Sequence, residues 1–112
     1  MQTMPKQNDF PAGALVMLAL RVLQPGPLHG YAISQRIRTL SSDVLQVEEG
    51  SLYPALQKML LKGWVSSEWG VSETGRRVRF YHLTASGRKQ LRDQVAQHET
   101  ITNAIQAVLR TA

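Results

Sequence analysis

The chain contains no cysteine among its 112 residues. Disulfide bonds and thiolate metal sites are therefore excluded, and a cysteine-free composition is typical of a cytoplasmic protein. The sequence also has no run of 18 or more apolar residues, so we expect no membrane-spanning helix. The opening MQTMPKQNDFPAG has one lysine and no apolar stretch, which argues against a secretory signal. We expect residues 1–10 to form a flexible segment.

Motifs for catalysis and metal binding are missing as well. His29, His82 and His98 lie in separate parts of the chain, without the spacing of metal ligands. Glu48 and Glu49 are adjacent, so on a helix they would not face each other as a catalytic pair. There is no glycine-rich phosphate loop and no nucleophile motif. We therefore expect neither an enzyme nor a cofactor or metal site.

Acidic residues are scarce in one part of the chain. Residues 1–50 carry four basic and four acidic side chains, whereas residues 51–92 carry eight basic and two acidic ones. Residues 93–112 have a net charge of minus one, so the total of +5 arises from the middle segment. A localised basic surface favours a polyanionic partner such as a nucleic acid. The alternative is a solvated surface whose basic character has no function.

Two apolar patterns near the N-terminus predict helices. From Pro11, apolar residues recur at the spacing of a core-facing helix, and the sequence Pro25-Gly26-Pro27 ends it. The members of this stripe are Leu15, Leu18, Ala19, Val22 and Leu23. A second helix is predicted over residues 28–40 from the same spacing of Ile33, Ile37 and Leu40. The polar stretch 41–50 would then turn the chain.

A third helix is predicted over residues 51–62, before the favourable C-terminal Gly63. Its buried face would carry Leu52, Leu56 and Met59, with Leu60 at the edge. Pro54 is compatible with this helix because it falls in or next to the first turn, where a missing N–H costs little. The opposite face would expose small, polar and aromatic groups, namely Ser51, Tyr53, Pro54, Gln57, Lys58 and Leu61.

Two strands and a long helix are predicted in the remainder. The first strand is predicted over residues 64–69, which alternate in polarity, and the second over residues 77–83, which are rich in β-branched and aromatic side chains. The stretch 70–76 between them has glycines near both ends and is predicted to form a hairpin loop. Thr84 is a favourable N-cap. From Thr84 to Arg110 the chain contains no proline, and it contains no glycine after Gly87. A helix of about 27 residues would be roughly 40 Å long.

This order of elements predicts a mostly helical α+β fold. Residues 11–83 would form a winged helix-turn-helix of three helices and a two-stranded wing, and residues 84–112 a C-terminal dimerisation helix. That helix is longer than the preceding domain can cover, and an apolar stripe left exposed would be a liability in a monomer. We therefore expect a homodimer through Leu91, Val95, Ile101, Ile105, Val108 and Leu109.

The third helix holds the recognition position of a winged helix-turn-helix. Ser51 and the free N–H groups of the first turn would suit a phosphate, helped by the helix dipole. Tyr53 can donate its hydroxyl to a phosphate, Gln57 can read a base edge, and Lys58 can do either. The alternative is a surface helix with an incidental tyrosine.

Three arginines mark the expected wing. Alternation along the strand places Arg77 and Arg79 on one face, with Arg76 nearer the tip. Such a wing contacts the DNA backbone or inserts arginine into the minor groove. Protection of a strand edge by charge is the alternative. Trp64 and Trp69 flank the first strand and are expected in the core or an interface, a ligand site being the less favoured interpretation.

Four short sequences, in this order and spacing, resemble the PadR-type transcriptional regulators. They are GPLHGYAI at 26–33, GSLYPAL at 50–56, KGWV at 62–65 and RFYHLTASG at 79–87. The resemblance implies a cytoplasmic homodimeric repressor of efflux or detoxification genes, whose C-terminal helices cross at the dimer contact. By motif it also implies DNA contacts at Ser51, Tyr53, Pro54, Arg76 and Arg77, supported by Tyr31 and Ser34 on the second helix.

Two features depart from the family pattern. Leu60 stands where the family usually has an acidic residue. Some relatives hold flat ligands between aromatic groups at the dimer interface, whereas residues 84–112 contain no aromatic residue. The sequence therefore leaves open whether a small-molecule inducer is a partner.

The sequence thus predicts a sequence-specific DNA-binding regulator, a homodimeric repressor that binds double-stranded DNA at an inverted repeat. The alternative is a winged-helix module that binds a partner protein without specific DNA binding. A structured-RNA binder is a weaker third option, because exposed stacking aromatics for single strands are missing.

Overall fold

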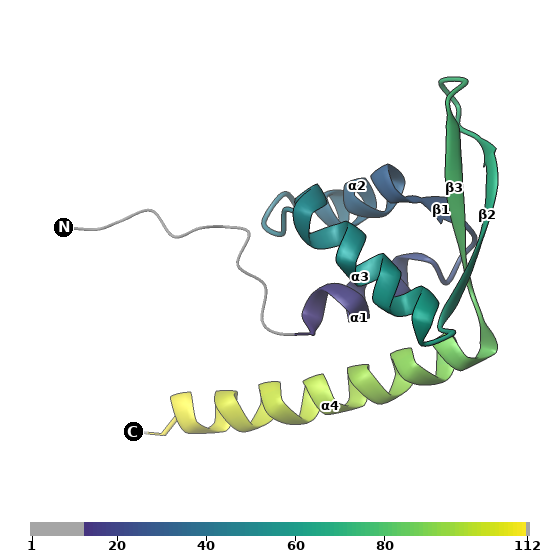
Figure 1. The fold of residues 1–112 in the computed structure, drawn as a ribbon. Helices are drawn as coiled ribbons and strands as arrows, with labels where there is room; N and C mark the ends of the chain where they lie inside the picture. Colours follow the sequence, from purple (N-terminus) through teal and green to yellow (C-terminus); the bar gives the residue numbers. More distant parts are fainter. Residues whose placement is uncertain (1–12, 112) are drawn as a thin grey trace.

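The computed structural model describes residues 13–111, so the predicted segment 1–10 and the predicted helix start at Pro11 lie outside the described residues. Within residues 13–111 the chain forms four helices and three strands (Figure 1). In chain order they are α1 (Ala14–Val22), β1 (Leu28–His29), α2 (Gly30–Leu40), α3 (Glu49–Leu61), β2 (Val65–Val71), β3 (Arg77–Leu83) and α4 (Ala85–Leu109). The predicted mostly helical winged helix-turn-helix with a long C-terminal helix is confirmed.

The first two helices follow the predicted apolar patterns with local shifts. Leu15 and Leu18 of α1 pack at the edge of the core rather than inside it, and Val16 and Leu20 are buried in their place. In α2 the predicted Ile33 and Ile37 are buried. Leu40 was expected beside them, but it is exposed because it is the last residue of the helix, beyond the reach of the core.

The sheet contains a short strand that the sequence patterns did not predict. β1 pairs with β3 in antiparallel register, with Leu28 opposite Tyr81 and His29 opposite Phe80, and the strand order is β1-β3-β2. The second helix was expected to begin at Leu28, but α2 begins at Gly30. His29 becomes its N-cap, because the ring Nδ1 accepts a hydrogen bond from the N–H of Ala32 at 3.4 Å.

The hairpin of β2 and β3 forms the wing. The predicted strand 77–83 is confirmed, whereas β2 extends to Val71, two residues beyond its prediction. Gly70, expected in the loop, lies inside β2 opposite Val78. The ring of Phe80 covers it so closely that a Cβ at position 70 would lie 2.7 Å from a ring carbon. A larger residue at position 70 would therefore displace the Phe80 ring, so glycine is favoured here by cross-strand packing rather than by a turn.

One hydrophobic core joins the helices to the base of the sheet. Its buried members are Val16, Ala19, Leu20, Val22, Leu23, Ile33, Ile37, Leu52, Ala55, Leu56, Met59, Val65, Tyr81 and Leu91. The members come from α1, α2, α3, β2, β3 and the start of α4. None of the described helices is long and apolar enough to cross a membrane.

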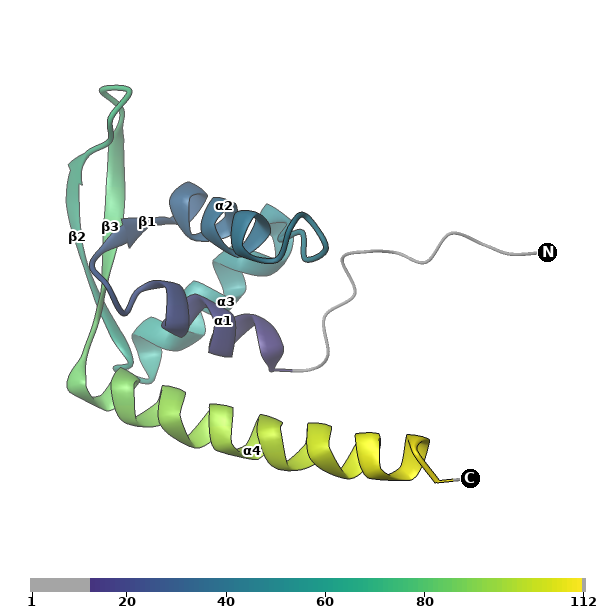
Figure 2. The ribbon, with the colours of Figure 1, turned by 180° about the vertical axis from the view of Figure 1, so that it is seen from behind.

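The start of α4 is fixed against the base of the wing. Thr84 is the N-cap as predicted, since its Oγ1 accepts a hydrogen bond from the N–H of Gly87 at 3.0 Å. The same hydroxyl lies 2.9 Å from the carbonyl oxygen of Trp64, to which it can donate. Figure 2 shows α4 running below α1 and continuing beyond it. Its first half is therefore docked on the domain, while its second half projects from it.

Candidate nucleic-acid interface

The recognition helix α3 separates a buried face from an exposed one. Leu52, Leu56 and Met59 are almost fully buried, which confirms the predicted core face. The predicted outer residues are all exposed, and they comprise Ser51, Tyr53, Pro54, Gln57, Lys58 and Leu61. The helix is thus held in place by its apolar stripe, and its polar groups are free to meet a ligand.

The N-terminus of α3 differs from the prediction in two respects. The helix begins at Glu49, so the N–H of Ser51 is not free but donates to the carbonyl oxygen of Glu48 at 3.0 Å. A phosphate at Ser51 would therefore meet its side-chain hydroxyl. Pro54 lies in the second turn rather than in or next to the first, and its ring nitrogen cannot donate to the carbonyl of Gly50.

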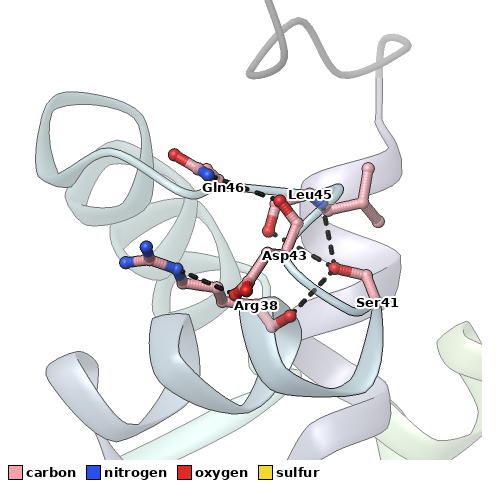
Figure 3. Close-up of polar contacts among 5 residues, drawn as sticks. All are labelled: Arg38, Ser41, Asp43, Leu45 and Gln46. Carbon is pink, nitrogen blue, oxygen red and sulfur yellow. Dashed lines mark hydrogen bonds and ion pairs between the residues drawn. The ribbon is translucent and has the colours of Figure 1, made fainter.

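The turn between α2 and α3 is closed by side-chain hydrogen bonds (Figure 3). The hydroxyl of Ser41 donates to the carbonyl oxygen of Arg38 at 3.2 Å and accepts from the N–H of Leu45 at 3.0 Å. Arg38 Nε contacts Asp43 Oδ1 at 3.2 Å, and Gln46 donates to the carbonyl oxygen of Asp43 at 3.3 Å. Asp43 has a left-handed backbone with φ of 67°, so this local network fixes a turn that the backbone alone disfavours. The turn sets where α3 begins relative to α2.

The two residues expected on α2 differ in their surroundings. The side chain of Tyr31 is exposed and faces the space beside the wing. The hydroxyl of Ser34 donates to the carbonyl oxygen of Tyr31 at 2.8 Å. While that bond is kept, Ser34 has no hydrogen to donate to a DNA phosphate, which can only accept hydrogen bonds.

The wing carries its arginines around one tryptophan. Arg77 Cζ lies 4.5 Å from the ring centroid of Trp69, and Arg79 Cζ lies 5.5 Å from it, so the prediction that these arginines share a face is confirmed. Trp64 and Trp69 were expected in the core or an interface. Trp69 is 57% exposed and does not enter the core. Trp64 packs against the core. Arg76 lies at the end of the hairpin loop and is exposed.

A cleft of about 590 Å³ lies between the wing and the N-terminal ends of α2 and α3. Its lining includes residues predicted to contact DNA from three different segments, namely Tyr31, Tyr53, Arg76, Arg77 and Arg79, together with Trp69. Ser34, Ser51, Pro54, Gln57 and Lys58 do not line it. The structure thus brings the tyrosines and arginines together and leaves the other predicted residues on the adjoining helix surfaces.

The lining of the cleft also includes the buried Tyr81. Burial raises the pKa of its hydroxyl above the ordinary value, and the positive charge of Arg79 opposes that shift. Tyr81 is therefore neutral at physiological pH. The charged groups facing the cleft are the three wing arginines and one acid, Glu73, which leaves an excess of positive charge.

The expected dimer residues on α4 fall into two groups. Leu91 is 4% exposed within the core of its own chain, and Val95 is half-buried against that core. The expectation that Leu91 contacts a second copy is corrected, because the side chain has little surface left to offer. The four remaining residues are each more than half exposed, and they are Ile101, Ile105, Val108 and Leu109.

The contact of Trp69 with the arginines was not predicted, although the sequence contains a signal for it. In a hairpin, residues at equal distances from the turn face each other, and Trp69 lies directly opposite Arg79 and diagonal to Arg77. The N-capping role of His29 had no comparable signal, because it depends on where β1 ends and α2 begins.

Three helices with an exposed third helix, next to a basic hairpin, define a winged helix-turn-helix, a class of DNA-binding folds. The model of the Transcriptional regulator PadR-like family matches residues 19–93, and the chain belongs to this family of transcriptional regulators. The resemblance read from the four short sequences is thereby confirmed.

Relatives of known name and structure agree with this assignment. The chain is 26% identical over 86 residues to the Negative transcriptional regulator PadR of Bacillus subtilis, a match that covers 77% of this chain and 47% of that protein. A transcriptional regulator from Clostridium thermocellum superposes with a TM-score of 0.77 at 27% identity, covering 85% of this chain and 89% of that one. A PadR family transcriptional regulator from Eggerthella lenta gives a TM-score of 0.74 at 29% identity, covering 89% and 85%.

Proposed function

We propose that this chain is a homodimeric repressor that binds double-stranded DNA sequence-specifically at an inverted repeat and catalyses no reaction. The observation that carries the proposal is the cleft in which Tyr31, Tyr53 and the wing arginines converge beside the exposed face of α3. In a duplex, each groove is flanked by two phosphate backbones. The exposed face of α3 can enter the groove while the tyrosines and arginines of the cleft contact the adjacent backbone.

In the proposed complex α3 enters the major groove. Gln57 lies on its outer face, where a side-chain amide can read the edge of an adenine, and Lys58 can contact a base or a phosphate. Tyr53 and Ser51 offer hydroxyl groups to the backbone next to the N-terminus of the helix. The wing contributes Arg76 and Arg77 as phosphate contacts, with Arg79 farther from the hairpin turn along β3.

The proposed dimer forms through the second half of α4. Residues 11–83 then serve as the DNA-binding unit and residues 84–112 as the dimerisation helix. The four exposed apolar residues lie in the second half of α4, where a second copy can cover them. The end of this helix extends past α1 (Figure 2). Burial of such a stripe is favourable at about 25 cal/mol per Å² of apolar surface. Two copies related by a two-fold axis would present two recognition helices to two half-sites.

The repressor role rests on similarity. The relative from Bacillus subtilis is named a negative regulator, and we extend that mode of action to this chain. Repression requires only that a bound dimer block transcription. Efflux or detoxification genes are the proposed targets, and the cytoplasm, where the operator DNA lies, is the proposed location. A small-molecule inducer would act by weakening the DNA complex.

One observation favours a second function. Leu61 is 88% exposed at the C-terminal end of α3, and it is flanked by the half-buried Leu60. An apolar side chain on the outer face of α3 would suit a protein partner. A winged-helix module that binds a protein without specific DNA binding is therefore the alternative.

Selection of bound sequences from a random duplex pool distinguishes the two functions. For the regulator we expect enrichment of an inverted repeat whose half-site centres are separated by about 10 bp or a multiple of it, followed by a footprint that covers both half-sites. Enrichment of no sequence at all would favour the protein-interaction module. A single, unrepeated half-site in the footprint would contradict the dimeric mode of binding while leaving DNA binding intact.

A further inference from the structure

The stack of Arg77 and Arg79 on Trp69 is a built feature of the wing. Trp69 occupies the strand position directly opposite Arg79, and the diagonal neighbour is Arg77. Both guanidinium carbons lie within 5.5 Å of the indole centroid. Arg79 Nη2 also donates to Ser67 Oγ at 2.7 Å, on the same strand as the indole. Two long side chains that ordinarily occupy many rotamers are thereby held over one ring.

The chemistry of this stack differs from that of an ion pair. Among residues 13–111, neither of these arginines has a carboxylate at ion-pair distance. An acid at position 69 would fix the guanidinium groups but would also neutralise them. An indole attracts a cation through its π face and leaves the net charge unchanged. Contact with a π face does not use the N–H donors of a guanidinium, so those of Arg77, and those of Arg79 that Ser67 does not bind, stay available for a phosphate or a base.

Exposure of the ring supports a role outside the core. Trp69 is 57% exposed and lines the cleft that also contains Tyr31 and Tyr53. Its contribution to the stability of the fold is therefore limited, since a strand surface of this kind tolerates other side chains. The indole and the two arginines instead form one face of the surface that the proposed DNA complex would use.

We propose that Trp69 is a positioning residue for DNA binding, which holds Arg77 and Arg79 in the orientation that the operator complex requires. The proposal rests on the proposed function and adds a residue outside the recognition helix that sets the affinity for specific DNA. Immobilising one long side chain at an interface lowers affinity by a factor of about 2 to 12. Because Trp69 restrains two arginines in each protomer before DNA arrives, most of that loss is avoided in the complex.

The expected signature separates orientation from charge. Replacing Trp69 by Ala keeps every positive charge, so the slope of log affinity against log salt should be unchanged. The affinity for the operator should fall by about tenfold or more. Binding to a scrambled duplex should fall less, since non-specific binding depends on charge and not on a fixed geometry. Trp69→Phe, which retains an aromatic face, should recover most of the operator affinity.

A double-mutant cycle tests whether Trp69 acts through the arginines. Operator binding is measured for the wild type, Trp69→Ala, the pair Arg77→Ala with Arg79→Ala, and the triple variant. We expect Trp69→Ala to cost about tenfold in the wild-type background and less than about twofold in the background without the arginines. An equal loss in both backgrounds would show that the indole contacts DNA directly, and would overturn the proposal. Equal losses for Trp69→Ala and Trp69→Phe would overturn it as well.

A measurement on the free protein keeps the test independent of DNA. The side-chain protons of Arg77 should show an upfield ring-current shift in the NMR spectrum that disappears in Trp69→Ala. Absence of that shift in the wild type would overturn the proposal whatever the DNA result. Thermal unfolding of Trp69→Ala should match the wild type, which excludes a folding defect. A wild-type protein that bound operator and scrambled duplex equally well would instead contradict the proposed function.

Discussion

Substitution of Gly87 by Ala should destabilise the protein, although alanine is the better helix former. Gly87 lies in the first turn of α4, where it is buried against the base of the wing. A Cβ at this position would lie 2.0 Å from the carbonyl oxygen of Trp64 and 2.8 Å from a methyl carbon of Leu83. The first neighbour is backbone, so the clash can be relieved only by moving α4 away from β2.

The magnitude follows from three opposing contributions. Alanine gains up to about 1 kcal/mol over glycine in a helix. Forcing an extra carbon into a packed site costs about 1–3 kcal/mol. Moving α4 also strains the cap, in which Thr84 Oγ1 accepts from the N–H of Gly87 at 3.0 Å, and loss of such a cap costs about 1 kcal/mol. The expected net loss in the free energy of unfolding is about 1–3 kcal/mol.

Urea unfolding at one fixed protein concentration measures this loss, because the stability of the proposed dimer would depend on concentration. Gly50→Ala is the matched control. Gly50 also lies in the first turn of a helix, α3, and a Cβ there would have no heavy atom within 4 Å. This control should be as stable as the wild type or more stable by up to about 1 kcal/mol.

The refuting result is a Gly87→Ala variant that is as stable as the wild type with an unchanged urea dependence. It would mean that α4 is not held against Trp64 in solution. The angle between α4 and the wing would then be variable, and the proposed dimer could not fix the spacing of its two recognition helices.

Three further predictions concern binding. Deletion of residues 100–112 removes the exposed apolar half of α4, so sedimentation should show a monomer and operator affinity should collapse; a variant that stays dimeric and binds normally would contradict the dimer. The pair Arg76→Ala and Arg77→Ala should flatten the slope of log affinity against log salt by roughly 2 per protomer, on operator and scrambled duplex alike; an altered sequence preference at unchanged slope would instead make the wing a base reader. Gln57→Ala should leave the slope unchanged and lose roughly 1–3 kcal/mol of discrimination at one base pair of each half-site, measured by titration of operator variants; uniform weakening on all sequences would argue against base reading.

Patterns within a single segment were enough to predict most of the elements. The apolar spacing of Leu52, Leu56 and Met59 located the buried face of α3, and with it the exposed face that carries Gln57. The strand 77–83 and the N-cap at Thr84 were also predicted at the residues where the structure has them. Helical periodicity, strand alternation and capping depend on neighbours within a few residues, so the sequence contains their whole signal.

The candidate site was predictable in its parts. Alternation placed Arg77 and Arg79 on one face of the wing, and short motifs identified Tyr31 and Tyr53. Their distance from one another was not predictable, because they belong to three elements whose relative positions depend on the core. The structure brings them to one cleft and excludes Ser34 and Gln57 from it.

Contacts between distant segments were decided by the tertiary structure alone. The two-residue strand β1 has too few residues for a periodic pattern and exists because β3 offers it backbone partners. Gly70 was expected in the hairpin loop and Gly87 inside the last helix, and neither pattern indicated the Phe80 ring or the Trp64 carbonyl that approaches each of them from another segment. Leu91 belongs to the same apolar repeat as Ile101, and only the place where α4 leaves the domain makes one a core residue and the other an exposed one. Local sequence patterns limit which residues can be buried, whereas packing selects which of them this chain covers and which it leaves exposed. The physical reason is that burial depends on what lies opposite a side chain in space.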